Sequence, residues 1–240
     1  MAQQETLRLD RYLCESLELT RSQARALIAS GAVTVNGMVC KKADARVSTA
    51  DTVAAQGRPV AHKAFVYLML DKPAGVVSAS EDGRDTTVVD LVRPAWPRRA
   101  LFPAGRLDKD STGFVLLTDD GGFAHDILAP RRHVAKTYLV RIDRPLTAAM
   151  VQGFADGVTL ADGSRMQPAA LAPAAPGEQT LCRVVLTQGV YHQIKRMFGV
   201  FEAGVVSLRR VAIGGLPLDE TLGPGGWREL TAVEVRKIME

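Results

Sequence analysis

The chain has 240 residues, of which 47% are hydrophobic, so it is long enough to bury a sizeable core in one large or two unequal domains. No apolar run reaches the ~18 residues of a membrane span, and the polar start lacks the charged and apolar regions of a signal peptide, so we expect a cytoplasmic protein with no membrane partner. The formal net charge of +4 is compatible with a polyanionic partner but does not require one.

The cysteines and histidines do not show the spacing of a metal site. Cys14, Cys40 and Cys182 are far apart and include no CxxC pair, and the four histidines form no HExxH or HxH pattern. We therefore predict reduced thiols, no disulfide and no metal ion. Since no cofactor-binding motif is present either, we predict no cofactor.

Residues 7–40 are predicted to form two short helices and a hairpin. Leucines recur every four residues from 9 to 17 and give one apolar helical face. The sequence TRSQ at 20–23 is a capping box that begins a second helix, which Gly31 ends. The sequence VTVNGMVC at 33–40 then predicts two strands joined by a tight turn at Asn36 and Gly37.

This series of motifs resembles the S4 RNA-binding domain over roughly residues 7–55. Between residues 8 and 46, seven Lys/Arg side chains stand against four acids. By itself this surplus indicates no more than a solvated surface. The resemblance implies that basic side chains of this unit contact RNA phosphates, namely Arg8, Arg21, Arg25, Lys41 and Lys42.

A connection to a second domain is predicted at residues 56–63, where QGRPVAHK has turn composition and no periodicity. This places the domains at 1–60 and 61–240. The second domain begins with a continuous apolar strand at 65–70, which is followed by the turn sequence KPAG at 72–75.

The sequence GRLDKDSTG at 105–113 leads directly into FVLLT at 114–118, which has the composition of a buried strand. Its carboxylates, Asp108 and Asp110, would lie at the edge of that strand. One alternative is that these carboxylates are simply part of a charged turn. They could belong to a calcium loop, although an EF-hand requires flanking helices, or to a magnesium phosphatase, although an aspartyl nucleophile should follow a strand without proline and glycine.

Two later segments also place polar groups beside predicted strands. The basic sequence PRRHVAK at 130–136 precedes the strand TYLVR at 137–141, in which an isolated Tyr138 would ordinarily be a core residue. The sequence GVYHQIKRMF at 189–198 follows a strand at 181–186 and opens a helix. Elsewhere we predict a helix at 145–155, a loop at 171–179, a strand at 205–211 and a short helix near Glu234.

In order and spacing, these segments resemble the RsuA-like group of rRNA pseudouridine synthases. The match consists of KPxG, then GRLD with TG and LLTDDG, then KTY, then GxxHQIKRM. The resemblance implies an α+β fold, in which a small S4 domain precedes a catalytic domain with a mixed, mainly antiparallel sheet. Val190 departs from the family pattern, which usually has arginine or another polar residue there, and this makes local RNA contacts less certain.

The resemblance implies three catalytic residues. Asp108 would be the essential carboxylate and Tyr138 would stack beside the target base, while Arg106 would help to keep that base flipped. Lys195 would keep Asp108 ionised, because a cation within about 4–6 Å lowers the pKa of a carboxylate. Further RNA contacts are implied at Lys72, Arg131, Arg132, Lys136, His192, Gln193 and Arg196.

We therefore expect a monomer that isomerises a specific uridine of rRNA to pseudouridine, with 16S rRNA as the expected substrate. The relatives that modify 23S rRNA share every motif above, so a 23S target stays open. A non-catalytic S4-type ribosome-assembly protein would also carry the basic segments, but it gives no reason for the combination of Asp108, Tyr138 and Lys195.

Overall fold

A computed structural model describes residues 6–48, 50–129, 132 and 134–240. The chain divides into two compact units. The first comprises Met1–Phe65 together with Trp96–Arg99, and the second comprises Val66–Ala95 and Ala100–Glu240. The expected domain boundary between residues 60 and 61 stays a prediction. In the described part of the chain, no helix is long and apolar enough to cross a membrane.

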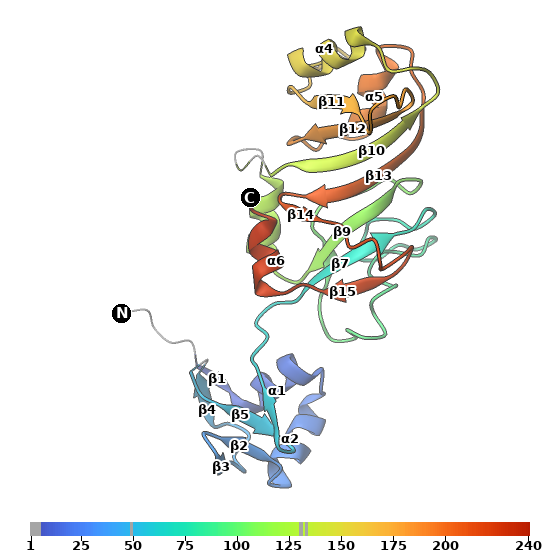
Figure 1. The fold of residues 1–240 in the computed structure, drawn as a ribbon. Helices are drawn as coiled ribbons and strands as arrows, with labels where there is room; N and C mark the ends of the chain where they lie inside the picture. Colours follow the sequence, from blue (N-terminus) through green and yellow to red (C-terminus); the bar gives the residue numbers. More distant parts are fainter. Residues whose placement is uncertain (1–5, 49, 130–131, 133) are drawn as a thin grey trace. The chain divides into compact units, whose positions relative to one another are not determined.

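The first unit consists of two helices and two small antiparallel sheets (Figure 1). One sheet has the order β3-β2-β5-β6, and β1 pairs with β4 in the other. The capping box at the start of α2 is confirmed, because the Thr20 hydroxyl accepts a hydrogen bond from the Gln23 amide while the Gln23 side chain accepts one from the Thr20 amide. The elements are α1 (Leu9–Leu17), α2 (Arg21–Ala29), β1 (Thr6–Arg8), β2 (Val33–Val35), β3 (Met38–Val39), β4 (Arg46–Ser48), β5 (Val53–Ala55) and β6 (Arg58–Val60).

A four-residue segment from later in the chain, Trp96–Arg99, packs within this first unit. Arg99 donates to the backbone carbonyls of Lys63 at 2.7 Å and Ala64 at 3.1 Å, and it forms an ion pair with Glu18 at 3.3 Å. The Lys63 ammonium lies 5.2 Å from the centre of the Trp96 ring, within cation–π range. The chain therefore passes from one unit to the other three times.

The second unit is built on a nine-stranded sheet, whose main order is β11-β12-β10-β13-β9-β7-β15 (Figure 1). All of its strand pairs are antiparallel except β9 with β13, which confirms the mixed, mainly antiparallel sheet. The strands are β7 (Tyr67–Lys72), β8 (Phe102–Pro103), β9 (Thr112–Thr118), β10 (Lys136–Ile142), β11 (Ala170–Pro173), β12 (Leu181–Leu186), β13 (Val205–Ile213), β14 (Leu216–Pro217) and β15 (Trp227–Glu229). The helices are α3 (Gly121–Leu128), α4 (Ala148–Asp156), α5 (Gln193–Gly199) and α6 (Ala232–Lys237).

The sheet differs from the sequence-based expectation mainly at its edge. The loop expected at 171–179 is wrong in part, because β11 (Ala170–Pro173) pairs with β12. Proline and alanine disfavour a central strand, but β11 is the outer strand of the sheet, where proline is tolerated. The helix at 145–155 begins later than expected, at Ala148, because the Thr147 hydroxyl caps the amide of Met150.

The parallel contact of β9 with β13 depends on Gly113. This residue has φ +100° and lies opposite Arg210 in the ladder. A Cβ at this position would clash with the carbonyl oxygen of Arg210 and would lie 2.8 Å from its amide nitrogen. Only glycine fits both this backbone conformation and this close approach.

We predict that Gly113→Ala destabilises the second unit by about 3 kcal/mol, since it combines backbone strain with overpacking against a neighbouring strand. Urea unfolding followed by tryptophan fluorescence measures the change. The matched control is Gly121→Ala at the start of α3, because a Cβ there has no heavy atom within 4 Å. Equal stabilities for the two variants would contradict the steric argument.

Candidate active site

The loop before β9 carries Asp108, and buried contacts from the 72–78 segment hold this loop in place. Ser78 and Leu107 exchange two hydrogen bonds, of 2.9 and 3.1 Å, between the Ser78 hydroxyl and the Leu107 backbone. The Gly75 amide donates to the Lys109 carbonyl at 2.8 Å. The turn at 72–75, which the sequence places far from the loop, thus forms one side of it.

Lys72 lies beneath the same loop with no solvent exposure. Its ammonium donates to the carbonyls of Ser111 at 2.7 Å, Pro73 at 3.0 Å and Lys109 at 3.3 Å. Burial lowers the pKa of Lys72 to about 8, against the opposing effect of the Asp110 and Asp108 charges. The RNA contact implied at Lys72 stays a prediction, and it would compete with the loop, because all three donors of the buried ammonium bond to backbone carbonyls.

Asp108 and Lys195 form the ion pair that the sequence predicts. The Lys195 ammonium lies 3.3 Å from Asp108 Oδ2, and it also donates to both carboxylate oxygens of Asp110 at 2.8 Å. Burial lowers the pKa of Lys195, but the hydrogen bond to Asp110 and the charge of Asp108 outweigh it, so the pKa is raised overall. The hydrogen bond from Lys195 in turn lowers the pKa of Asp110.

His192 contacts the other oxygen of Asp108, with its Nε2 3.5 Å from Oδ1. This residue stands immediately before α5 in the left-handed conformation, with φ 51°. Such a backbone is costly for a side chain with a Cβ and is found where the surrounding structure requires it. Here the turn orients the imidazole toward Asp108 and stacks it on the exposed ring of Tyr191, at 3.8 Å between centroids.

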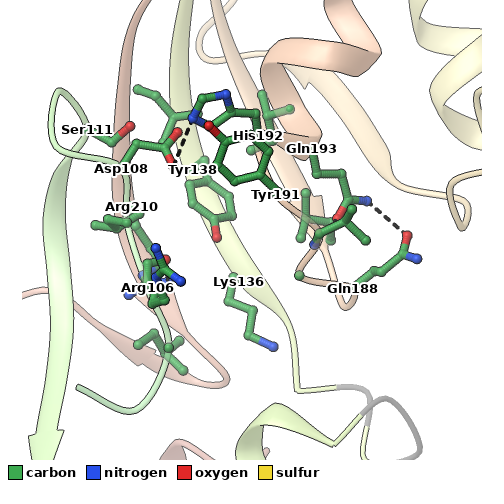
Figure 2. A pocket seen from close by; sticks show the side chains of 18 of the residues that line it. Arg106, Asp108, Ser111, Lys136, Tyr138, Gln188, Tyr191, His192, Gln193 and Arg210 are labelled. Carbon is green, nitrogen blue, oxygen red and sulfur yellow. Dashed lines mark hydrogen bonds and ion pairs between the residues drawn. The ribbon is translucent and has the colours of Figure 1, made fainter. Parts of the chain in front are cut away.

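These groups line one cavity of about 570 Å³ between the loop, β10, β13 and the start of α5 (Figure 2). Tyr138 lies on β10 and is only 8% exposed, and Figure 2 shows its ring between Asp108 and Lys136. Gln193 is buried and its side chain bonds to Gln188 at 3.1 Å. The cavity brings together seven of the predicted site residues: Arg106, Asp108, Lys136, Tyr138, His192, Gln193 and Lys195.

Two other predicted RNA contacts of the second unit, Arg132 and Arg196, lie outside this cavity. Arg132 forms an ion pair with Asp126 at 3.4 Å, and Arg196 pairs with Asp162. Arg131 lies outside the described residues. Among the described residues no group of three potential ligands is placed to hold a metal ion.

The predicted contacts of the first unit fall into two sets. Arg8 and Arg25 form ion pairs with the buried carboxylate of Asp10, at 3.0 and 3.3 Å. The Arg8 hydrogen bond lowers the pKa of Asp10. The remaining three, Arg21, Lys41 and Lys42, are exposed, and none of them forms an ion pair with a carboxylate in the described part of the chain.

Sequence reasoning missed two conspicuous residues of the cavity. Arg210 lies on β13 and is 3% exposed, although its sequence context is an ordinary strand. Tyr191 is 72% exposed at the cavity wall. Tyr191 could have been found from its place beside His192 in the sequence GxxHQIKRM, whereas Arg210 is brought to the cavity only by strand pairing.

Comparison with known proteins supports this arrangement. The family model described as RNA pseudouridylate synthase matches residues 66–199, and the S4 domain model matches residues 7–53. The chain is 40% identical over 237 residues to an uncharacterized RNA pseudouridine synthase of Bacillus subtilis, covering 98% of this chain and 99% of that protein. It is 38% identical over 237 residues to ribosomal small subunit pseudouridine synthase A of Escherichia coli K12, covering 97% and 100% of the two chains.

A crystal structure of pseudouridylate synthase superimposes with a TM-score of 0.67 at 36% identity, and it covers 97% of this chain and 99% of that one. The chain therefore belongs to the RNA pseudouridylate synthase family, as an enzyme that carries an N-terminal S4 domain.

Proposed function

We propose that this enzyme isomerises one uridine of 16S rRNA to pseudouridine. The observation that carries the proposal is the Asp108 carboxylate, which lines one cavity together with Tyr138 and is paired with Lys195. The choice of 16S rRNA is supported by the relatives named ribosomal small subunit pseudouridine synthase A. A uridine of 23S rRNA is the second candidate, since the sequence motifs do not separate the two.

The reaction breaks the bond between C1′ and N1 of uridine, turns the base and joins C1′ to C5. It is an isomerisation, so it needs no oxidant and no energy input. The base must leave its stack to reach the enzyme. In this cavity Tyr138 would stack on the flipped uracil, and Arg106, which is exposed at the wall, would occupy the space that the base leaves.

Asp108 would act on the sugar or the base through its carboxylate. Lys195 places an ammonium 3.3 Å from Oδ2 of this group, and His192 places Nε2 3.5 Å from Oδ1. Because Lys195 also binds Asp110 through two hydrogen bonds, its ammonium is held in one position. These contacts align Asp108 before the substrate arrives.

The S4 domain would bind the RNA backbone through Arg21, Lys41 and Lys42. These cations are exposed and have no carboxylate partner among the described residues. They are therefore better phosphate ligands than Arg8 and Arg25, which Asp10 already neutralises in part. We further propose that the enzyme acts as a monomer in the cytoplasm, where rRNA would be its substrate. Light scattering of the purified protein tests the monomer.

The first prediction concerns Asp108→Asn, which should abolish turnover and leave the RNA dissociation constant within a few-fold, because phosphate contacts carry most of the affinity. Tritium release from 5-tritiated 16S and 23S transcripts and ribosomal particles measures turnover. Release by the wild type on 16S rRNA alone is the expected result. Release only on 23S rRNA would contradict the substrate assignment, and turnover by the variant would contradict the role of Asp108.

The second prediction concerns the triple variant Arg21→Gln, Lys41→Gln, Lys42→Gln. Losing three phosphate contacts should flatten the slope of log K against log salt concentration by about 2 to 3. Filter binding between low and moderate salt concentration measures this slope. The control removes two exposed cations of α6, Arg236→Gln and Lys237→Gln, and should keep the wild-type slope. A wild-type slope in the triple variant would exclude these side chains as contacts.

The third prediction concerns Lys72→Met, which should lower turnover by about tenfold or more through a displaced loop, while RNA affinity stays unchanged.

The pKa of Lys72 is about 8 in the folded protein, below its ordinary value, so between about pH 8 and pH 10 the unfolded chain binds more protons. Wild-type stability should therefore rise across this range relative to the variant. Urea unfolding at about pH 8 and pH 10 measures this rise in stability. Weaker RNA binding by the Lys72→Met variant would instead support Lys72 as an RNA contact.

A further inference from the structure

Strand pairing places two cationic side chains beside Tyr138. Lys136 and Tyr138 are two residues apart on β10 and point to the same face of the sheet. In the ladder between β10 and β13, Tyr138 lies opposite Arg210. All three side chains line the cavity that contains Asp108 (Figure 2).

The Arg210 guanidinium is buried with an unused donor. Its Nε donates to the Phe114 carbonyl at 2.6 Å, while Nη1 reaches the Arg106 carbonyl only at 3.5 Å. Nη2 has no hydrogen-bond partner and is out of contact with solvent. Leaving a charged donor unsatisfied in the interior is costly, so the arrangement calls for a ligand.

The Lys136 ammonium also lacks close hydrogen-bond partners. It is 8% exposed, and its ammonium contacts the carbonyls of Ile127 and Thr187 at 3.5 Å, the outer limit of a hydrogen bond. Burial and then the positive charge of Arg210 lower the pKa of Lys136 to about 8. In the described part of the chain no carboxylate lies within ion-pair distance of either cation, and the cavity's Asp108 is already paired with Lys195.

The proposed function supplies an anion that fits this place, and the following inference rests on it. When the C1′–N1 bond breaks, its electron pair leaves with N1 and gives a uracil monoanion, whose charge is shared by its two carbonyl oxygens. C5 of the base then forms the new bond to C1′ and loses its proton, while N1 gains a proton. Between these steps the free anion has to turn without leaving the cavity.

We propose that Arg210 and Lys136 bind the carbonyl oxygens of the uracil base and stabilise its negative charge after the glycosidic bond breaks. Donors that are already oriented in a dry site stabilise developing charge strongly, because they need no reorganisation. A phosphate of the RNA is the less suitable ligand. Both side chains are more than nine-tenths buried beside the ring on which the base would stack, whereas phosphates follow the exposed surface.

The test compares two RNA substrates that differ in the stability of the departing anion. The target position carries either uridine or 5-fluorouridine, whose fluorine stabilises the anion of the free base. Single-turnover loss of the target nucleoside is measured by nuclease digestion and mass spectrometry. If Arg210 stabilises the anion, then Arg210→Gln should slow the uridine substrate by about 100-fold and the 5-fluorouridine substrate by about tenfold or less.

Two further variants keep the test decisive if Arg210→Gln folds poorly. Lys136→Gln should show the same difference between the two substrates, and Arg210→Lys should recover part of the rate on uridine. The matched control is Arg209→Gln, the neighbouring arginine of β13. Arg209 does not line the cavity and instead binds the buried carboxylate of Asp71, at 2.9 and 3.0 Å. The Arg209→Gln variant should slow the reaction of both substrates by the same factor, or slow neither reaction.

The outcomes separate the inference from the proposed function. Equal slowing of both substrates by Arg210→Gln and by Lys136→Gln would overturn the inference. Weaker RNA binding with an unchanged maximal rate would overturn it in favour of a phosphate contact. If the wild type converted neither substrate, the proposed function itself would fail, and the uracil anion would fail with it.

Discussion

The structure depends on the close parallel contact of β9 with β13 at Gly113. Because a Cβ at this residue would overlap the backbone of Arg210, glycine allows the two strands to pair where any other residue would separate them. β9 follows the loop that carries Asp108, and β13 pairs on its other side with β10. One steric condition therefore brings the carboxylate loop, Tyr138 and Arg210 to the same cavity.

Charge is distributed unevenly around this cavity. Lys195 contacts two carboxylates, and Lys72 gives its three donors to backbone carbonyls, so both cations hold the loop in a defined position. Lys136 contacts two carbonyls only at 3.5 Å, and Arg210 donates from Nε to Phe114 while its Nη2 has no hydrogen-bond partner in the described part of the structure. The cations that hold the Asp108 loop are thus fully bonded, while those next to Tyr138 retain free donors.

Features set by local sequence could be predicted, while those set by strand pairing could not. The capping box of α2 and the buried strand β9 depend on neighbouring residues, and both are confirmed. The ion pair of Lys195 with Asp108 was predicted through a family motif. The burial of Lys72 and the position of Arg210 opposite Tyr138 depend on partners far along the chain. No periodicity carries that information, and the edge strand β11 was missed because proline and alanine obscure it.

The segment Trp96–Arg99 affects whether recombination can exchange one unit without the other. It packs with the first unit although the residues on both sides of it belong to the second. A single recombination event near residue 65 would therefore exchange most of the S4 unit but leave these four residues behind. Arg99 would then lack its partners Glu18 and Lys63 unless the incoming unit offered equivalent groups. In this chain the two modules are expected to evolve as a matched pair.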